Sequence, residues 1–343
     1  MNRTREGSPE APIGVIDSFV QGFDRVAARP ALLLPPLVLD LLLWLGPKVS
    51  ISPLLDRVVA QLRMPVAGEL ALQEQVELVR EYLTNLGEHF NLLTTLSSLP
   101  TGVPSLMAGV MPENAPIDLF SVMRVGEPGL VLMAWLALTV VGLGLGAFYH
   151  RWIARAAAPE ASIPSGLWAW SRLLLLALVV YAGLLVGGAV ALALASVATF
   201  ILPLLGVGVS FVAFSLLFWL IVYLIFTPHG IVRYRFGVVR SMLESVLIVR
   251  WNFMATVGFL GAALLISWVT NMVWMLPDSG SWYGVLAIIG HAFISGMLLT
   301  SSYTFYQGRR EWLVAAREEI ESRLRRMEHR SGLEEGNSDG GVS

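Results

Sequence analysis

The feature that most constrains this chain is a run of 56 residues, 173–228, with no charged residue and no histidine. A helix of roughly 20 apolar residues crosses a hydrocarbon core about 30 Å thick, so the run predicts two membrane spans joined by a tight turn. Pro203, Gly206 and Gly208 interrupt the run and mark that turn. The chain is therefore expected to fold in a lipid bilayer.

Four further stretches complete the predicted spans. Residues 129–149, 253–276 and 282–306 contain no Asp, Glu, Lys or Arg. The stretch 31–51 is interrupted by Pro35, Pro36, Asp40 and Gly46, but its leucines favour insertion. The chain has 55% hydrophobic and 14% charged residues, whereas soluble domains carry about 25% charged residues. We expect an all-α, polytopic helical membrane protein with six transmembrane helices, the last five within residues 129–306.

Charge and cysteine counts exclude several classes of function. The net charge of -2 is wrong for a strongly basic nucleic-acid binder, so no nucleic-acid partner is expected. The absence of cysteine excludes disulfides, thiolate metal sites and a cysteine nucleophile. We predict no catalytic residues, no metal site and no cofactor.

The distribution of basic residues predicts the orientation. With six spans, 18 of the 23 Lys and Arg residues fall on one side of the membrane, in the two termini and the second and fourth connections. Basic residues concentrate in cytoplasmic loops, so both termini are predicted to be cytoplasmic.

Residues 52–128 are predicted to form an extracytoplasmic helical insertion. Two apolar stripes with helical spacing run through residues 51–62 and 72–93, which indicates two amphipathic helices that pair as a hairpin over the bundle. Five prolines follow, and they predict a winding loop. These prolines are Pro100, Pro104, Pro112, Pro116 and Pro128.

Amphipathic segments also occur on the predicted cytoplasmic side. The arm 1–30 contains one at 13–28, and others precede the fifth span at 238–250 and the third span at 165–172. We interpret them as interfacial helices. Each is followed by a transmembrane hairpin, so we hypothesise a unit of interfacial helix plus hairpin that is repeated three times. Residues 307–330 are predicted to form a cytoplasmic amphipathic helix and residues 331–343 a disordered tail.

The segment 13–28 leading into Arg29, Pro30 and the Leu/Pro-rich first span, together with the run that includes Gly237, Arg250 and Asn252, resembles one family. It is similar to bacterial six-helix membrane proteins of the glycerophosphoryl diester phosphodiesterase membrane-domain kind. The resemblance implies a bacterial cytoplasmic (inner) membrane. The chain lacks the His and carboxylate cluster of the phosphodiesterase domain, so the resemblance does not extend to that activity.

Small residues inside the spans predict close helix packing. Gly142/Gly146 and Gly183/Gly187 are pairs with i, i+4 spacing, the small-xxx-small pattern by which membrane helices approach each other.

Among the polar side chains within the predicted spans, three form the candidate intramembrane site: Asp40, Asn271 and His291. We expect Asp40 and His291 to face each other near mid-depth. Ser295, one turn from His291, also suggests an intramembrane protease, but such enzymes place nucleophile and base on different helices.

Few polar groups lie in the spans, so the leading hypothesis is a scaffold, assembly or regulatory component without a catalytic site. Besides the lipid bilayer, its expected partners are membrane proteins or further copies of itself. A transporter or lipid-handling permease with a midplane polar site is the alternative, and an intramembrane enzyme comes third.

Overall fold

The computed structural model describes residues 11–62, 70–98, 100–112, 114–117, 119–160 and 162–338. Five helical spans are long and apolar enough to cross a membrane. They are α6 (Pro128–Ala157), α7 (Gly166–Ile201), α8 (Pro203–Leu224) with α9 (Thr227–Tyr234), α11 (Phe253–Trp274) and α12 (Gly284–Ser338). A bent pair of helices near the N-terminus raises the number to six if it is one span. The predicted class, a polytopic helical membrane protein, is confirmed.

The bent pair consists of α1 (Val15–Ala27), followed at 96° by η1 (Pro30–Leu33) and α2 (Leu34–Leu45). Pro30 lacks an N–H group and restricts the residue before it, which explains why the first helix ends there. The predicted span 31–51 was too long at its C-terminal end, because Gly46 and Pro47 stop the helix.

The bent pair follows α12 from one end of the span to the other. An added Cβ on Gly308 would lie 2.7 Å from Ile13, and one on Gly284 would lie 2.9 Å from Trp44. We call the end of the bundle at Gly308 the terminal side and the end at Gly284 the loop side.

Small residues fix α1 against α12. The buried face of α1 is Ser18, Gly22 and Val26, and Gly22 packs on Ser301 and the backbone of Met297. The apolar residues Ile16, Val20 and Phe23 stay exposed on α1, where lipid can cover them. The bundle therefore covers the apolar face of this helix only in part, through contacts such as that of Phe19 with Phe259.

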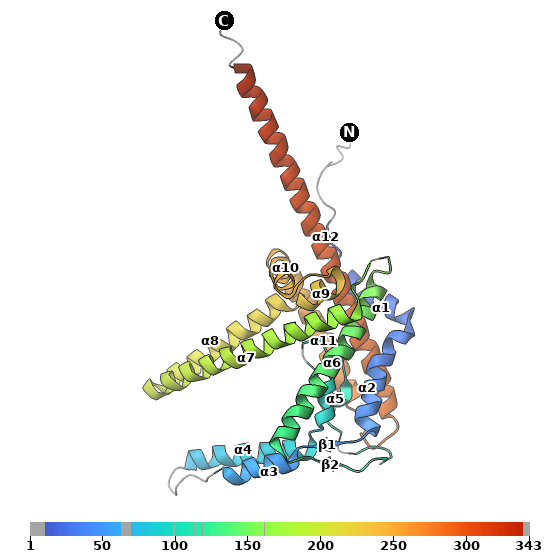
Figure 1. Cartoon of the computed structure of the whole chain (residues 1–343), viewed down its shortest axis with the longest axis vertical. Coiled ribbons are helices and arrows are strands. Elements are labelled where there is room, and N and C mark those ends of the chain that lie inside the picture. Colours follow the sequence, from blue (N-terminus) through green and yellow to red (C-terminus); the bar gives the residue numbers. More distant parts are fainter. Residues whose placement is uncertain are drawn as a thin grey trace.

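Three extensions leave the bundle (Figure 1). The α7–α8 hairpin projects sideways, α12 continues far beyond the terminal side, and α3 (Ser52–Gln61) and α4 (Leu70–His89) lie across the loop side. The helix α3 packs on the second half of α4, with Ser52 beside Gly87 and Leu62 beside Arg80, as expected for the predicted hairpin.

A short parallel bridge closes the connection between α2 and α6. In it, β1 (Val49–Ser50) pairs with β2 (Met123–Arg124), Val49 being opposite Met123. Between them, η2 (Leu92–Leu96) and α5 (Leu106–Val110) belong to an inserted segment, residues 91–98 and 100–112, that packs into the bundle beside α6 and α2. Residues 97–98 and 100–105 lie outside helices, as predicted for the winding loop, but α5 interrupts it, and Val103 and Leu106 bury their apolar side chains in the core.

Two helix boundaries also differ from expectation. Residues 166–172 are the start of α7 rather than a separate interfacial helix, since no glycine or proline separates them from the span. The helix α12 continues to Ser338 through the predicted disordered tail, because adding a residue to an existing helix is cheap. The predicted arm up to residue 10 and the tail residues 339–343 lie outside the described residues.

Helix α10 (Val238–Trp251), the segment predicted before the fifth span, completes the terminal side. An aromatic stack joins the helices there. Phe19 of α1 lies on Phe259 of α11 with ring centroids 4.8 Å apart, and Phe259 lies 4.6 Å from Phe305 of α12.

Candidate functional site

Asp40 is the most deeply buried acid of the described chain, with none of its surface exposed. It lies on α2 and points at the inserted segment. Its Oδ1 atom accepts hydrogen bonds from the hydroxyl of Ser105 and from the N–H of Met107, the latter at 3.0 Å. Ser105 in turn accepts the N–H of Ala108 at 3.0 Å as the N-cap of α5. The first N–H groups of a helix have no partner within the helix, and Asp40 accepts one of them, that of Met107, at the start of α5.

His291 faces the second oxygen of the same carboxylate. Its Nδ1 atom lies 3.8 Å from Asp40 Oδ2, and its side chain is 20% exposed on α12. Both of these atoms are buried and have no hydrogen bond within the described chain. The separation is longer than a hydrogen bond but short enough for an electrostatic contact between α2 and α12.

Two glycines of α6 admit the inserted segment. A Cβ on Gly142 would lie 2.5 Å from the carbonyl oxygen of Leu96, and one on Gly146 would overlap the carbonyl oxygen of Thr101. The approaching backbone belongs to the inserted segment, whereas we expected a neighbouring span. These glycines and Asp40 contact the same segment from two sides.

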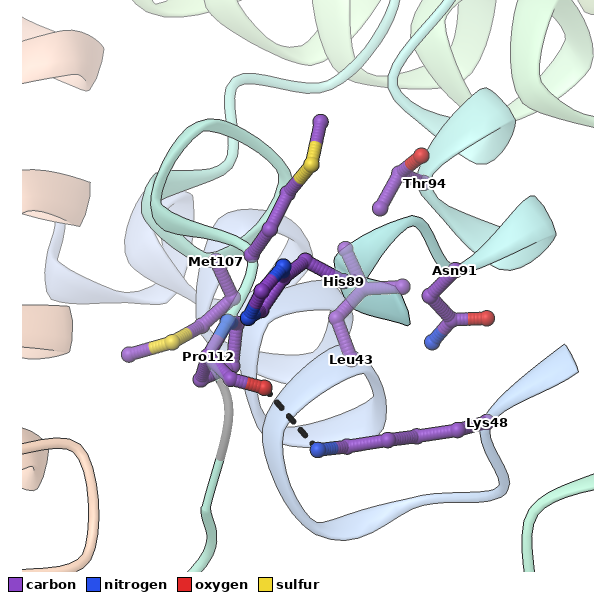
Figure 2. Close-up of a pocket in the computed structure, with 8 residues that line it drawn as sticks. Leu43, Lys48, His89, Asn91, Thr94, Met107 and Pro112 are labelled. Carbon is purple, nitrogen blue, oxygen red and sulfur yellow. Dashed lines mark hydrogen bonds between the residues drawn. The ribbon is translucent and has the colours of Figure 1, made fainter. Parts of the chain in front are cut away.

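A small cavity lies next to this contact (Figure 2). Its volume of about 10 Å³ is close to the space needed by one water molecule. Lys48 Nζ crosses it to donate to the carbonyl oxygen of Pro112 at 2.9 Å. Met107 lines the cavity with its side chain while its N–H binds Asp40. A wider cleft of about 430 Å³, lined by His89, Met111 and others, adjoins it on the loop side.

The remaining predicted residues lie apart from this pair. Asn271 is on α11, where its amide contacts Met275 Sδ at 3.6 Å on the same helix. Ser295 donates to the carbonyl oxygen of His291 at 2.7 Å, so its hydroxyl is engaged by the backbone rather than by the imidazole. Gly183 and Gly187 lie on the projecting part of α7, and an added Cβ there would meet no described atom within 4 Å.

A second buried polar cluster lies nearer the terminal side. His150 Nδ1 lies 3.0 Å from the hydroxyl of Tyr303, and His229 Nε2 lies 2.8 Å from the hydroxyl of Ser302. The rings of His229 and Tyr303 are 4.2 Å apart. The sequence places the two histidines at the ends of different spans, and nothing in it indicates that one tyrosine joins them.

Among the described residues, no group of three or more His, Asp or Glu side chains could hold a metal ion. The fold and these contacts define the class: a polytopic helical membrane protein in which a buried carboxylate holds a segment inserted into the helical bundle. Comparison with known proteins assigns no family within this class, because no family model, curated protein or solved structure matches the chain. The resemblance to the glycerophosphoryl diester phosphodiesterase membrane domain stays a prediction.

Proposed function

We propose that the protein is a membrane scaffold or assembly component without catalytic activity, and that the α7–α8 hairpin is its partner-binding arm. The observation that supports this proposal is that most of the hairpin does not pack against the rest of the described chain. Beyond Tyr181, whose ring lies 6.3 Å from that of Trp135 on α6, no residue of α7 is buried. In α8 only Gly206 and Val222 are buried.

The exposed hairpin has the surface that membrane helices use to associate. Lipid already covers apolar side chains, so helix association in a bilayer depends on close packing, which small residues permit. Gly183 and Gly187 form such a surface, and the open space beside them leaves room for another helix.

The use of Asp40 supports a scaffold over a carrier. Its Oδ1 atom holds Ser105 and Met107, so the carboxylate is engaged in fixing the inserted segment. A rigid core from which three extensions project suits a protein that organises partners (Figure 1).

Site-specific photo-crosslinking in native membranes tests the partner-binding arm. Leu194 is seven residues after Gly187 and shares its helix face, whereas Leu192 points to the opposite face. Both are exposed. A photoreactive residue at 194 should give a protein adduct, and one at 192 mainly lipid adducts. Lipid adducts alone at 194 would contradict the proposal. Two differently tagged copies then distinguish self-association from a separate partner.

A matched variant links the adduct to the glycine surface. Gly187→Leu should remove the adduct at 194 while the unfolding temperature in detergent stays unchanged, because the added side chain meets open space. An adduct that persists in this variant would place the partner elsewhere.

The orientation and membrane belong to the same proposal. Helix ends at the terminal side carry several arginines, which supports a cytoplasmic location for that side, and the resemblance stated above supports a bacterial inner membrane. These arginines are Arg151, Arg155, Arg172, Arg233 and Arg240.

A midplane transport site is the second candidate. Asp40 Oδ2 and His291 Nδ1 are buried without hydrogen bonds and face each other beside a broken span. Ionisable pairs at broken helices are common in transporters. Proton flux in proteoliposomes that Asp40→Asn abolishes would favour transport, and flux equal to that of empty liposomes would remove this candidate.

A further inference from the structure

A stacked pair of aromatic rings at the terminal side collects three arginines. The rings of Tyr234 and Phe236 lie 5.7 Å apart. The guanidinium carbon of Arg240 is 4.0 Å from the centre of the Phe236 ring, and that of Arg310 is 5.2 Å from the same ring. Arg310 and Arg233 also lie over Tyr234, at 4.1 and 5.0 Å. Three guanidinium groups, one each from α9, α10 and α12, therefore lie against the same two aromatic rings.

Two further arginines extend this group across α7. Arg172 and Arg235 each lie 5.8 Å from the ring of Trp168. Arg235 stands between Tyr234 and Phe236 in sequence, so the two groups are contiguous. Together they form the arginine cluster, which consists of Arg172, Arg233, Arg235, Arg240 and Arg310.

No ion pair of the described residues balances the arginine cluster, although Glu311 and Glu244 act electrostatically on the neighbouring Tyr234 and Tyr306. The ion pairs of the described residues involve Asp40, Glu319 and Glu321, and none includes an arginine of the cluster. The Nε atoms of Arg233 and Arg310 are buried without a hydrogen-bond partner in the described chain. Buried donors without partners are rare in folded proteins, and a bound ion or ligand is one way to satisfy them.

Backbone strain singles out Arg235. This residue ends α9 with a φ of 56°, in the left-handed region, and the N–H of the next residue, Phe236, donates to the carbonyl oxygen of Gly230. Glycine is the usual residue at this position of a helix end because it adopts the conformation without strain. An arginine held there suggests a requirement for its side chain, since strained residues concentrate at ligand sites.

Apolar side chains beside the cluster identify the kind of anion. Leu167 and Val239 precede Trp168 and Arg240 in the sequence, and each is 71% exposed. Guanidinium groups bind phosphate through paired hydrogen bonds, and basic pockets at the ends of spans bind phospholipid headgroups. We propose that the arginine cluster binds the phosphate of an anionic phospholipid, with the acyl chains against the exposed apolar residues of α7 and α10.

Lipid titration of the purified full-length chain tests this site. The protein in a neutral detergent is titrated with phosphatidylglycerol or phosphatidylcholine, and bound lipid is counted by native mass spectrometry while the unfolding temperature is recorded. Wild type should bind phosphatidylglycerol preferentially and be stabilised by it. In Arg235→Gly the lipid-free protein should be at least as stable, because the strain is removed, yet its apparent affinity for phosphatidylglycerol should fall about five-fold.

Two controls make the result specific. Arg155→Gln removes an exposed arginine of α6 at the same side and should bind phosphatidylglycerol as wild type does. Arg240→Gln provides a second cluster variant should Arg235→Gly fail to fold, and it too should lose affinity. Unchanged affinity in the cluster variants, or an equal loss in Arg155→Gln, overturns the site. Equal stabilisation of wild type by glycerol phosphate and by phosphatidylglycerol would overturn the assignment to a lipid.

Discussion

The carboxylate of Asp40 and the imidazole of His291 face each other across the bundle, with Oδ2 and Nδ1 3.8 Å apart. The contact connects α2 to α12, while the other carboxylate oxygen holds Ser105 and Met107 of the inserted segment. One side chain thus ties together three parts of the chain. Burial of a carboxylate is costly unless it is paired or hydrogen-bonded, so these contacts explain how Asp40 is tolerated inside the bundle.

The Asp40–His291 contact predicts energetic coupling. Asp40→Asn and His291→Gln, made singly and together, should show a coupling free energy of at least about 0.5 kcal/mol in unfolding measured in detergent. Asn271→Ala serves as the control, because Asn271 bonds along its own helix and should be additive with Asp40→Asn. Additive effects for Asp40 and His291 would mean that the two residues are energetically independent.

The position of the inserted segment predicts that leucine at two glycines of the spans will affect stability very differently. Gly146→Leu should destabilise the fold by at least about 2 kcal/mol, because even a Cβ overlaps the carbonyl oxygen of Thr101 and the backbone must move. Gly183→Leu should change stability by less than about 0.5 kcal/mol, since the site is open. Thermal unfolding of both variants checks the contrast, and equal losses would contradict the packing of Thr101 against α6.

The spans could be predicted because their cause is local. A length of uncharged, apolar sequence is sufficient to identify α7 and α8, and the turn at Pro203 follows from the chemistry of that residue. The short strand pair of Val49 and Met123 could not be predicted, because its partners are far apart in sequence and each strand has only two residues.

The site was only partly accessible to sequence reasoning. Asp40 and His291 stand out because ionisable groups are rare in spans, and their similar depth suggested that they meet. Ser105 before Leu106 carries an N-cap pattern that could have identified α5. Its position beside Asp40 depends on tertiary packing, and the many prolines nearby suggested a loop instead.

Burial within the inserted segment predicts where proteases cut. In vesicles with the loop side outward, chymotrypsin should cleave first at Leu119 or Phe120, which are exposed outside helices. Leu96 and Leu106 should resist, because they are buried against the spans. Mapping the first fragments by mass spectrometry checks the order. Early cleavage at Leu106 would show that the inserted segment leaves the bundle.

The last prediction concerns the number of crossings, five or six, which depends on the bent pair. Arg309 Nη2 donates to the carbonyl oxygen of Ile13 at 2.9 Å, which places the start of α1 beside the terminal side of α12. Trp44, near the end of α2, packs on Gly284 and donates to the carbonyl oxygen of Ser279 at 2.9 Å. From Gly284 to Gly308, α12 rises by about 36 Å, which is enough to cross the hydrocarbon core.

The bent pair should therefore cross the membrane as one span. Reporters fused to the N-terminus and inserted after Ala158 and after Gly237 should all report the cytoplasm, while insertions after Phe120 and Ser279 report the opposite side. A five-span protein would place the N-terminal reporter with Phe120 and leave the other four unchanged. The N-terminal fusion thus decides between the two topologies, and the insertions after Ala158 and Ser279 serve as internal controls because three spans separate them in either case.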